Sequence, residues 1–254
     1  MGLIIMYNVL VTGSGGFIGK NLIVKLACNM DVNILEFKRG NTLAELKELV
    51  LKSDFIYHIA GEVRPTSSDE EFQSSNVTLT KEILTILETD KKYTSILYVS
   101  SIHAKLLKNE YGKSKRESEL LIESYAKKHN VGCSIYRLPH VFGEECKPNY
   151  NSVISTWVYN SINNLEINVY DRSIEMHYVY VQDIVEEFLC ELKRTNQGVV
   201  YKEPSKVYET TLGMVIDYID EFKNNIANSS YVVKNNSFKA KLFITYKDYW
   251  SKKS

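Results

Sequence analysis

The sequence has few cysteines and no surplus of charge of either sign. Its four cysteines, at positions 28, 133, 146 and 190 of 254 residues, include no Cys-x-x-Cys pair. This spacing predicts neither a disulfide framework nor a metal site. Lys plus Arg and Asp plus Glu number 31 each. That balance argues against a nucleic-acid partner, because such proteins carry a basic excess.

Long apolar runs are also missing. No stretch is long enough to span a bilayer, and the opening Met-Gly-Leu-Ile-Ile-Met lacks the basic residues of a signal peptide. We therefore expect a soluble protein of the reducing cytoplasm, with no membrane partner. No internal repeat or low-complexity linker divides the chain. Its length and 44% hydrophobic content suit one α/β domain with a small lobe.

A glycine turn near the start of the chain is the clearest motif present. The apolar run 7–12 predicts a buried strand, Gly13, Gly16 and Gly19 follow it, and the apolar residues then recur with a helical period. In a dinucleotide fold these glycines permit the turn, the approach of a pyrophosphate and the packing of helix on strand. The helix N-terminus adds N–H groups and a positive dipole end. An ordinary strand-to-helix turn is the alternative.

The second predicted strand, 32–37, ends beside residues that bear on the choice of cofactor. In a dinucleotide fold an acidic residue here favours the free 2′-hydroxyl of NAD, whereas a cation favours the 2′-phosphate of NADP. The sequence has both, since Glu36 is followed by Lys38 and Arg39. Arg39 can bind a phosphate through two hydrogen bonds. NADP is the prediction, and NAD with Glu36 at the ribose is the alternative.

Strands and helices continue to alternate, which predicts a doubly wound parallel sheet with a Rossmann topology. Apolar runs predict strands at 54–60 and 95–101. Apolar residues with a helical period predict helices at 43–51, 70–88 and 111–129. Ala60 and Gly61 end one strand, and small residues there let a cofactor lie against the backbone. His58 lies within the same apolar run, so we interpret it as a core residue rather than a ligand.

The residues typical of carbonyl chemistry follow the strand at 95–101. This strand ends at Ser101, and Tyr111 and Lys115 lie one turn apart on the next helix, so they share a face. A phenol has a pKa of about 10, and a neighbouring ammonium lowers that pKa by stabilising the phenolate. A serine hydroxyl can bond the same substrate oxygen.

These motifs, together with Arg-Leu-Pro-His-Val-Phe-Gly at 137–143, resemble the extended short-chain dehydrogenases/reductases of the NAD-dependent epimerase/dehydratase family. The stretches 146–154, 169–175 and 180–185 are similar to capsular-polysaccharide reductases that act on UDP-4-keto-6-deoxy-hexosamines. The resemblance implies an NADP-binding Rossmann core over 1–145 and a substrate lobe over 146–254, interleaved in a single compact unit. It places the catalytic roles on Ser101, Tyr111 and Lys115.

Three features depart from relatives of this fold. Members of the reductase group often carry a C-terminal cupin domain, and the residues after the predicted helix 212–222 are too few for one. Sugar-nucleotide dehydratases have an Asp-Glu pair where this chain has Ile102 and His103, which argues against dehydration. The segment 39–54 is also short, as in 4-keto-6-deoxy sugar reductases.

Short polar residues lie at the start of the predicted substrate lobe. Asn149, Asn151 and Ser152 precede a predicted helix at 153–162, a placement suited to sugar hydroxyls or a diphosphate. Arg172 either pairs with a phosphate or is an ordinary surface arginine.

The residues and the resemblance together give two sets of candidates. The cofactor candidates are Gly13, Gly16, Phe17, Ile18, Glu36, Lys38, Arg39, Ala60, Gly61, Lys115 and Pro139. The substrate candidates are Arg64, Ser101, His103, Asn149, Asn151, Ser152 and Arg172.

The resemblance implies that NADPH reduces the 4-keto group of a UDP-2-acetamido-2,6-dideoxy-4-keto-hexose. The product would be a UDP-N-acetyl-6-deoxy-L-hexosamine of talo or rhamno configuration. An NAD-dependent 4-epimerase is the alternative, and a nucleotide-sensing relative without turnover is a third. We also expect a homodimer, because the apolar residues of helices 70–88 and 114–129 outnumber those that one core-facing stripe needs.

Overall fold

The computed structural model describes residues 7–29, 31–64, 66–150, 152–192, 197–228, 230–233 and 237–253. The contacts of the chain divide it into two units. One comprises Met1–Leu138 and Val185–Pro204, and the other comprises Pro139–Ile184 and Ser205–Ser254.

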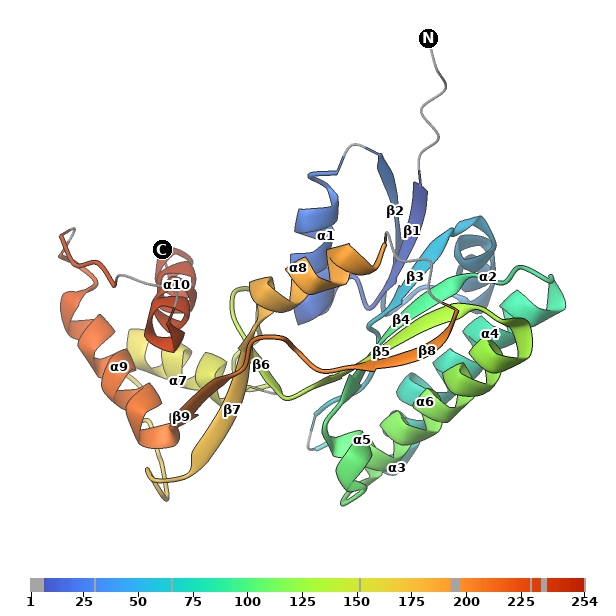
Figure 1. The fold of residues 1–254 in the computed structure, drawn as a ribbon. Coiled ribbons are helices and arrows are strands. Elements are labelled where there is room, and N and C mark those ends of the chain that lie inside the picture. The colour runs from blue at the N-terminus through green and yellow to red at the C-terminus, as the bar shows by residue number, and fades with distance from the viewer. Residues whose placement is uncertain are drawn as a thin grey trace, which may run out of the picture. The chain divides into compact units, whose positions relative to one another are not determined.

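The first unit is built on a six-stranded parallel sheet with the strand order β2-β1-β3-β4-β5-β8 (Figure 1). The strands are β1 (Tyr7–Thr12), β2 (Val32–Phe37), β3 (Phe55–His58), β4 (Ser95–Ser101), β5 (Gly132–Leu138) and β8 (Gly198–Lys202). The order reverses at β1, which has β2 on one side and β3 on the other. In such sheets the ligand crevice lies at the carboxyl ends of the strands at this switch point. The predicted doubly wound fold is confirmed.

Helices cover both faces of this sheet (Figure 1). On one face lie α1 (Phe17–Leu26) and the end of α8 (Val181–Glu191), joined by an ion pair between Lys25 and Glu186 at 3.5 Å. On the other lie α2 (Leu43–Lys52), α4 (Leu79–Thr89) and α6 (Glu110–His129). Successive side chains of β3 point to opposite faces of the sheet, and each face is covered by a different set of helices. Ile56 packs into the core under α2, α4 and α6, whereas Tyr57 stacks on Phe188 of α8.

The long helix predicted over 70–88 is interrupted. It consists of α3 (Asp69–Phe72), a π-helical turn η1 (Gln73–Thr78) and then α4. Ser68 and Glu71 form a capping box that starts α3. In the π turn each backbone hydrogen bond spans five residues instead of four, so the turn contains one extra residue. Asn76 lies within this turn and is 1% exposed.

The apolar second face expected on α4 and α6 is absent. Most of the apolar residues on which the prediction rested are buried in the core of the first unit, Leu79 and Leu121 are partly buried, and Leu120 is exposed. The buried ones are Val77, Ile83, Leu84, Ile86, Leu87, Ile122 and Tyr125. The reason is that α4 packs against both α2 and α6, so its apolar flanks meet neighbouring helices of the same chain. Most of the apolar residues on which this argument rested are therefore buried within one chain, and the homodimer stays a prediction.

The second unit has a three-stranded sheet of β6 (His140–Phe142), β7 (Glu175–Tyr180) and β9 (Tyr208–Thr211), with β7 parallel to β6 and antiparallel to β9. Its helices are α7 (Val153–Ile162), α9 (Leu212–Asn225) and α10 (Phe238–Ser251). An aromatic cluster that includes Phe142, Tyr178 and Phe238 forms its core. Among the described helices of the chain, none is long and apolar enough to cross a membrane.

Candidate active site

The glycine turn after β1 is shaped by contacts that leave no room for side chains. Gly13 has a φ of +74°, and a Cβ added to it would lie 2.8 Å from the Ala60 nitrogen at the end of β3. A Cβ on Gly19 would lie 2.1 Å from the Gly13 carbonyl oxygen. The Gly13 N–H donates to Phe37 O of β2 at 2.8 Å. The turn therefore lies at the carboxyl ends of three adjacent strands.

The helix after this turn starts without a capping side chain. Gly16 is the N-cap of α1, and the first turn holds no acidic residue. By contrast, α2 starts with a Thr42 capping box and α6 with Asn109 accepting from the Gly112 N–H. An uncapped helix N-terminus beside a backbone without Cβ atoms fits the pyrophosphate of a dinucleotide.

The end of β2 brings the cofactor candidates Glu36, Lys38 and Arg39 near this turn, and all three side chains are exposed. Lys38 flanks the turn, since its Cβ lies 3.8 Å from where a Cβ of Gly15 would be. The Arg39 side chain is 80% exposed, and its Nη2 lies 3.4 Å from Oε2 of Glu62.

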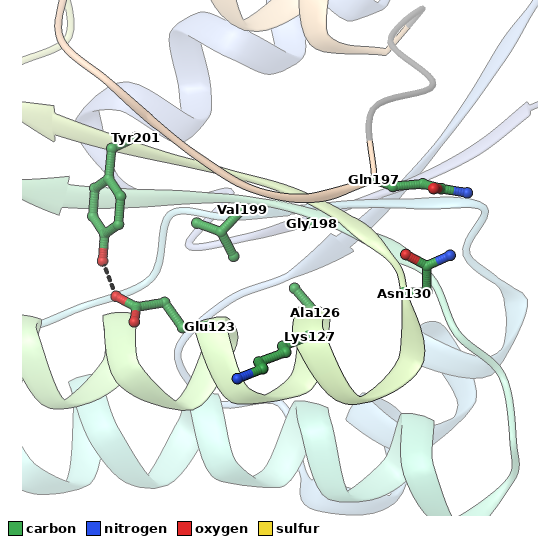
Figure 2. A pocket seen from close by; sticks show the side chains of 8 residues that line it. All are labelled: Glu123, Ala126, Lys127, Asn130, Gln197, Gly198, Val199 and Tyr201. Atoms are coloured by element: carbon green, nitrogen blue, oxygen red, sulfur yellow. Dashed lines mark hydrogen bonds between the residues drawn. The ribbon is translucent and has the colours of Figure 1, made fainter.

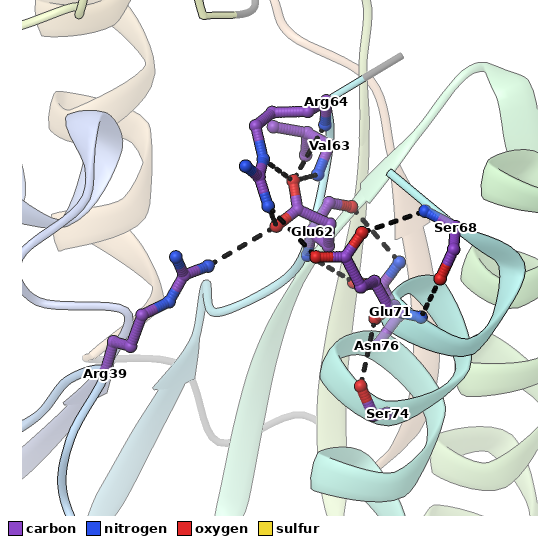
Figure 3. A network of polar contacts seen from close by, with 8 residues as sticks. All are labelled: Arg39, Glu62, Val63, Arg64, Ser68, Glu71, Ser74 and Asn76. Atoms are coloured by element: carbon purple, nitrogen blue, oxygen red, sulfur yellow. Dashed lines mark hydrogen bonds and ion pairs between the residues drawn. The ribbon is translucent and has the colours of Figure 1, made fainter. Parts of the chain in front are cut away.

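Glu62 is the centre of a polar network that the sequence did not predict (Figure 3). Its side chain is 2% exposed and accepts two hydrogen bonds of 2.9 Å from the Arg64 guanidinium. Burial would raise the pKa of Glu62, but bonds from Arg64 and the Val63 N–H lower it to about 2. Arg64, a substrate candidate, is thus held by Glu62 and also by Glu71 at 3.3 Å.

Asn76, from the π turn, joins this network to the helix of the catalytic candidates. Its Oδ1 accepts from the Glu62 N–H at 2.9 Å, and its Nδ2 donates to Ser114 Oγ at 3.0 Å. A Cβ on Gly61 would lie 2.5 Å from Asn76 Oδ1 and 3.1 Å from Lys115 Nζ. The end of β3, the π turn and Lys115 therefore meet at one place.

Ser101, Tyr111 and Lys115 are brought together in the first unit. Ser101 ends β4, a short helix α5 (His103–Leu106) follows, and Tyr111 and Lys115 lie in the first two turns of α6. The Ser101 hydroxyl accepts the His103 N–H at 3.3 Å, and the Ser101 side chain acts on the Tyr111 phenol by lowering its pKa. The ring of His103, a substrate candidate, is 5.8 Å from the Tyr111 ring.

The protonation of Tyr111 differs from the prediction. Burial raises the pKa of Tyr111 to about 12, while the Ser101 side chain acts in the opposite direction. The Lys115 Nζ donates to Val99 O at 2.8 Å and lies 4.8 Å from the centre of the Tyr98 ring. Burial lowers the pKa of Lys115 to about 8. The expected lowering of the phenol pKa by Lys115 is wrong for this structure, because burial dominates.

His58 is a core residue, as predicted. It is 1% exposed, and its ring nitrogens contact Thr12 Oγ1 and Thr80 Oγ1, both at 2.8 Å. The Thr80 hydroxyl donates to Asn76 O at 2.6 Å, so it accepts from Nε2–H of His58. Burial lowers the pKa of His58 to about 3, and the ring is neutral near pH 7.

The remaining candidates belong to the second unit, where Pro139 is the first residue. Ser152 caps α7 by accepting the Ser155 N–H. Asn149 is exposed with a φ of +54°, and its N–H donates to Thr156 Oγ1 at 3.0 Å. Arg172 pairs with Asp217 at 2.5 Å and bonds Gly213 O at 3.3 Å. Asn151 lies outside the described residues.

The sequence reading missed three buried polar residues, Glu62, Asn76 and Glu119. The sequence did point to Glu62, because it directly follows Ala60 and Gly61, the small residues just after β3. Glu119 had one too, because it lies four residues after Lys115 and therefore on the same helix face. Nothing in the sequence pointed to Asn76, because the spacing of apolar residues does not reveal a π-helical turn. In the described part of the chain, no group of three or more His, Cys, Asp or Glu side chains could hold a metal ion.

The chain is similar to known proteins over nearly its whole length. The chain is 33% identical over 241 residues to a UDP-2-acetamido-2,6-beta-L-arabino-hexul-4-ose reductase of Pseudomonas aeruginosa, and the match covers 94% of this chain and 64% of that protein. The crystal structure of the capsular polysaccharide assembling protein CapF of Staphylococcus aureus superposes with a TM-score of 0.83 at 38% identity, over 95% of this chain and 65% of that one. The chain thus spans just under two thirds of these longer relatives.

A more distant structure shows the fold alone. The UDP-glucose 4-epimerase of Thermotoga maritima, solved with UDP-glucose, has a TM-score of 0.82 at 15% identity, and the match covers 97% of this chain and all of that one. Residues 9–203 match the NAD dependent epimerase/dehydratase family. The chain therefore belongs to this family of nicotinamide-dependent enzymes.

Proposed function

We propose that the protein uses NADPH to reduce the 4-keto group of a UDP-2-acetamido-2,6-dideoxy-4-keto-hexose. The product is a UDP-N-acetyl-6-deoxy-L-hexosamine of talo or rhamno type. The observation that carries the proposal is the placement of Ser101 at the end of β4 beside Tyr111, whose pKa it lowers, with buried Lys115 one helical turn further on α6. The substrate class is supported by the similarity to the Pseudomonas aeruginosa reductase.

The chain's own residues supply the proton and the charge. When bound, the nicotinamide supplies a hydride to the keto carbon. Tyr111 is protonated at neutral pH and donates its proton to the keto oxygen, because the alkoxide that forms there is more basic than a phenolate. Ser101 donates a hydrogen bond to the same oxygen, and the Lys115 ammonium stabilises the negative charge left on Tyr111.

The cofactor would be held at the carboxyl ends of β1, β2 and β3. The uncapped N-terminus of α1, with Phe17 and Ile18, would hold the pyrophosphate. Lys38 and Arg39 would bind the 2′-phosphate, Ala60 and Gly61 would line the backbone side, and Lys115 would hold the nicotinamide ribose. In the second unit we propose that Asn149, Ser152 and Arg172 contact the UDP-sugar.

The decisive experiment is incubation of the purified protein with NADPH and the UDP-4-keto sugar. We expect one NADPH to be consumed for each ketone reduced, with NMR of the product assigning talo or rhamno geometry. Conversion without net NADPH consumption would mean a 4-epimerase that retains NAD. Binding of the nucleotide sugar without any turnover would mean a sensing protein.

The pH dependence of the reaction should report Lys115. Its pKa is lowered to about 8, so the ammonium is present below that pH and is lost above it. We expect kcat/KM to fall as the pH rises through about 8. Lys115→Arg keeps a positive charge to above pH ~12, so its residual activity should lack this alkaline limit. If both proteins have the same alkaline limit, Lys115 is not its source.

We propose that the protein is cytoplasmic, because its four free cysteines suit a reducing compartment. We also propose that it is a homodimer, on the basis of the family resemblance. Light scattering at micromolar protein concentration should give twice the mass of one chain. A mass near the 29.3 kDa of a single chain would show that the protein does not self-associate.

A further inference from the structure

Glu119 is a buried carboxylate that the proposed chemistry does not use. It lies on α6 one turn after Lys115, and its side chain is 0% exposed. Arg137 donates two hydrogen bonds to it, of 2.8 and 2.6 Å, and Arg116 donates one of 2.8 Å. The Ser100 hydroxyl donates a fourth, of 2.6 Å. A carboxylate out of water is stabilised only by such complete pairing.

These bonds connect the elements that carry the catalytic candidates. Ser100 precedes Ser101 on β4, whereas Glu119 shares α6 with Tyr111 and Lys115. Arg137 is the register partner of Ser100 on β5. On the other side of Ser101, the Ile102 N–H donates to Leu138 O of β5 at 3.1 Å. Ser101 is therefore held between two fixed residues, one of which is tied to the helix of Tyr111 through Glu119.

The charge of Glu119 also acts on Lys115. Bonds from Arg137, Ser100 and Arg116 lower the pKa of Glu119 although burial opposes them, so it is an anion at neutral pH. Burial lowers the pKa of Lys115, and Glu119 raises it. Three other titratable groups near Lys115 are His58 of β3, on whose pKa Lys115 acts, Tyr98 of β4, whose ring centre lies 4.8 Å from the Lys115 Nζ, and Tyr111, one turn earlier on α6. All three are neutral near pH 7, because burial lowers the pKa of His58 and raises those of both tyrosines.

We propose that Glu119 is a positioning residue, which fixes the Ser101 hydroxyl against Tyr111 through Ser100 and provides the anion that balances Lys115. This inference rests on the proposed function, since it assumes that these three residues are catalytic. An ion pair that serves only folding would stabilise the protein without changing the geometry around Ser101. The two roles predict different results for variants that break different bonds.

Two variants and a matched control separate these roles. Ser100→Ala removes the link to the strand and leaves both arginine pairs intact. Glu119→Gln removes the charge. Glu123→Gln is the control, because Glu123 lies one turn further on α6. It bonds Tyr201 (Figure 2) and, at 2.8 Å, Arg116, but neither Ser100 nor Arg137.

We expect Ser100→Ala to lower kcat about tenfold and Glu119→Gln about 10- to 100-fold, since small displacements of catalytic groups cost this much. The NADPH dissociation constant should change less than twofold in both. The alkaline limit of kcat/KM should move to lower pH in Glu119→Gln only. Glu123→Gln should match the wild type. If Glu119→Gln does not fold, Ser100→Ala still distinguishes a positioning role from a purely structural one, because it keeps the ion pairs of Glu119 with Arg116 and Arg137.

Hydrogen exchange in the free protein gives a readout that needs no substrate. The amides of Ile102 and His103 bond Leu138 O and Ser101 Oγ, so they should exchange faster in Ser100→Ala and Glu119→Gln but not in Glu123→Gln. Unchanged kcat and exchange in both variants, or equal losses in all three, would overturn the inference. A wild type inactive on the keto sugar would refute the proposed function, while faster exchange would still support the positioning by Glu119.

Discussion

Replacing Tyr111 by Phe is expected to abolish most turnover while NADPH still binds. The substitution removes only the hydroxyl, and the ring keeps its neighbours Phe72 and His103, whose ring centres both lie 5.8 Å from that of Tyr111. Loss of a general acid lowers rates by about 10²–10⁴. Steady-state kinetics should show this fall in kcat, and fluorescence titration should show NADPH affinity within a few-fold of the wild type.

Tyr125→Phe is the matched control for that experiment. Tyr125 lies on the same helix, is 2% exposed and donates its hydroxyl hydrogen bond to Thr94 O at 3.1 Å. The change is chemically identical but lies outside the proposed catalytic set, so kcat should be unaffected even if stability falls by about 1 kcal/mol. Near-normal turnover in Tyr111→Phe would remove this tyrosine from the mechanism.

The sequence predicted the bounds of strands and helices correctly where an apolar pattern ends at a turn, polar or capping residue. The strands at 7–12, 32–37 and 95–101 have the predicted bounds, because each apolar run ends at a turn or a polar residue. The helix at 153–162 also matches, since Ser152 caps it. The helix at 70–88 does not, because the π turn at Gln73–Thr78 is stabilised by long-range contacts of Asn76. Such contacts leave no periodic pattern in the sequence.

The same distinction applies to the candidate site. The glycine turn and the Tyr111–Lys115 pair depend on spacing within one segment, and the structure places them as that spacing implies. Glu62 also bonds Asn76, and Glu119 bonds Ser100 and Arg137, which all come from segments far apart in the chain, so no local pattern predicts these contacts. The pKa of Tyr111 was predicted in the wrong direction because burial is a property of the packed fold.

The proposed preference for NADPH rests on Arg39, a side chain that the structure leaves largely exposed. Arg39 makes one 3.4 Å contact with Glu62, whose charge is already bonded twice by Arg64. A single contact of an exposed arginine contributes about 0–1 kcal/mol, so it competes weakly with a phosphate. Arg39 therefore retains donors for the 2′-phosphate of NADPH, and Glu36, also exposed, is the residue that would favour NAD.

Arg39→Ala should consequently weaken NADPH binding much more than NADH binding. A charge-assisted hydrogen bond contributes about 1.5–3 kcal/mol, which corresponds to a loss of roughly 10- to 150-fold for NADPH. Dissociation constants measured by fluorescence at constant ionic strength would test this. Lys47→Ala removes the same charge from an exposed site on α2, paired with Asp90 at 3.3 Å, and should alter neither affinity. Equal losses for both cofactors in Arg39→Ala would show that Arg39 does not bind the 2′-phosphate, and Glu36 would then select NAD.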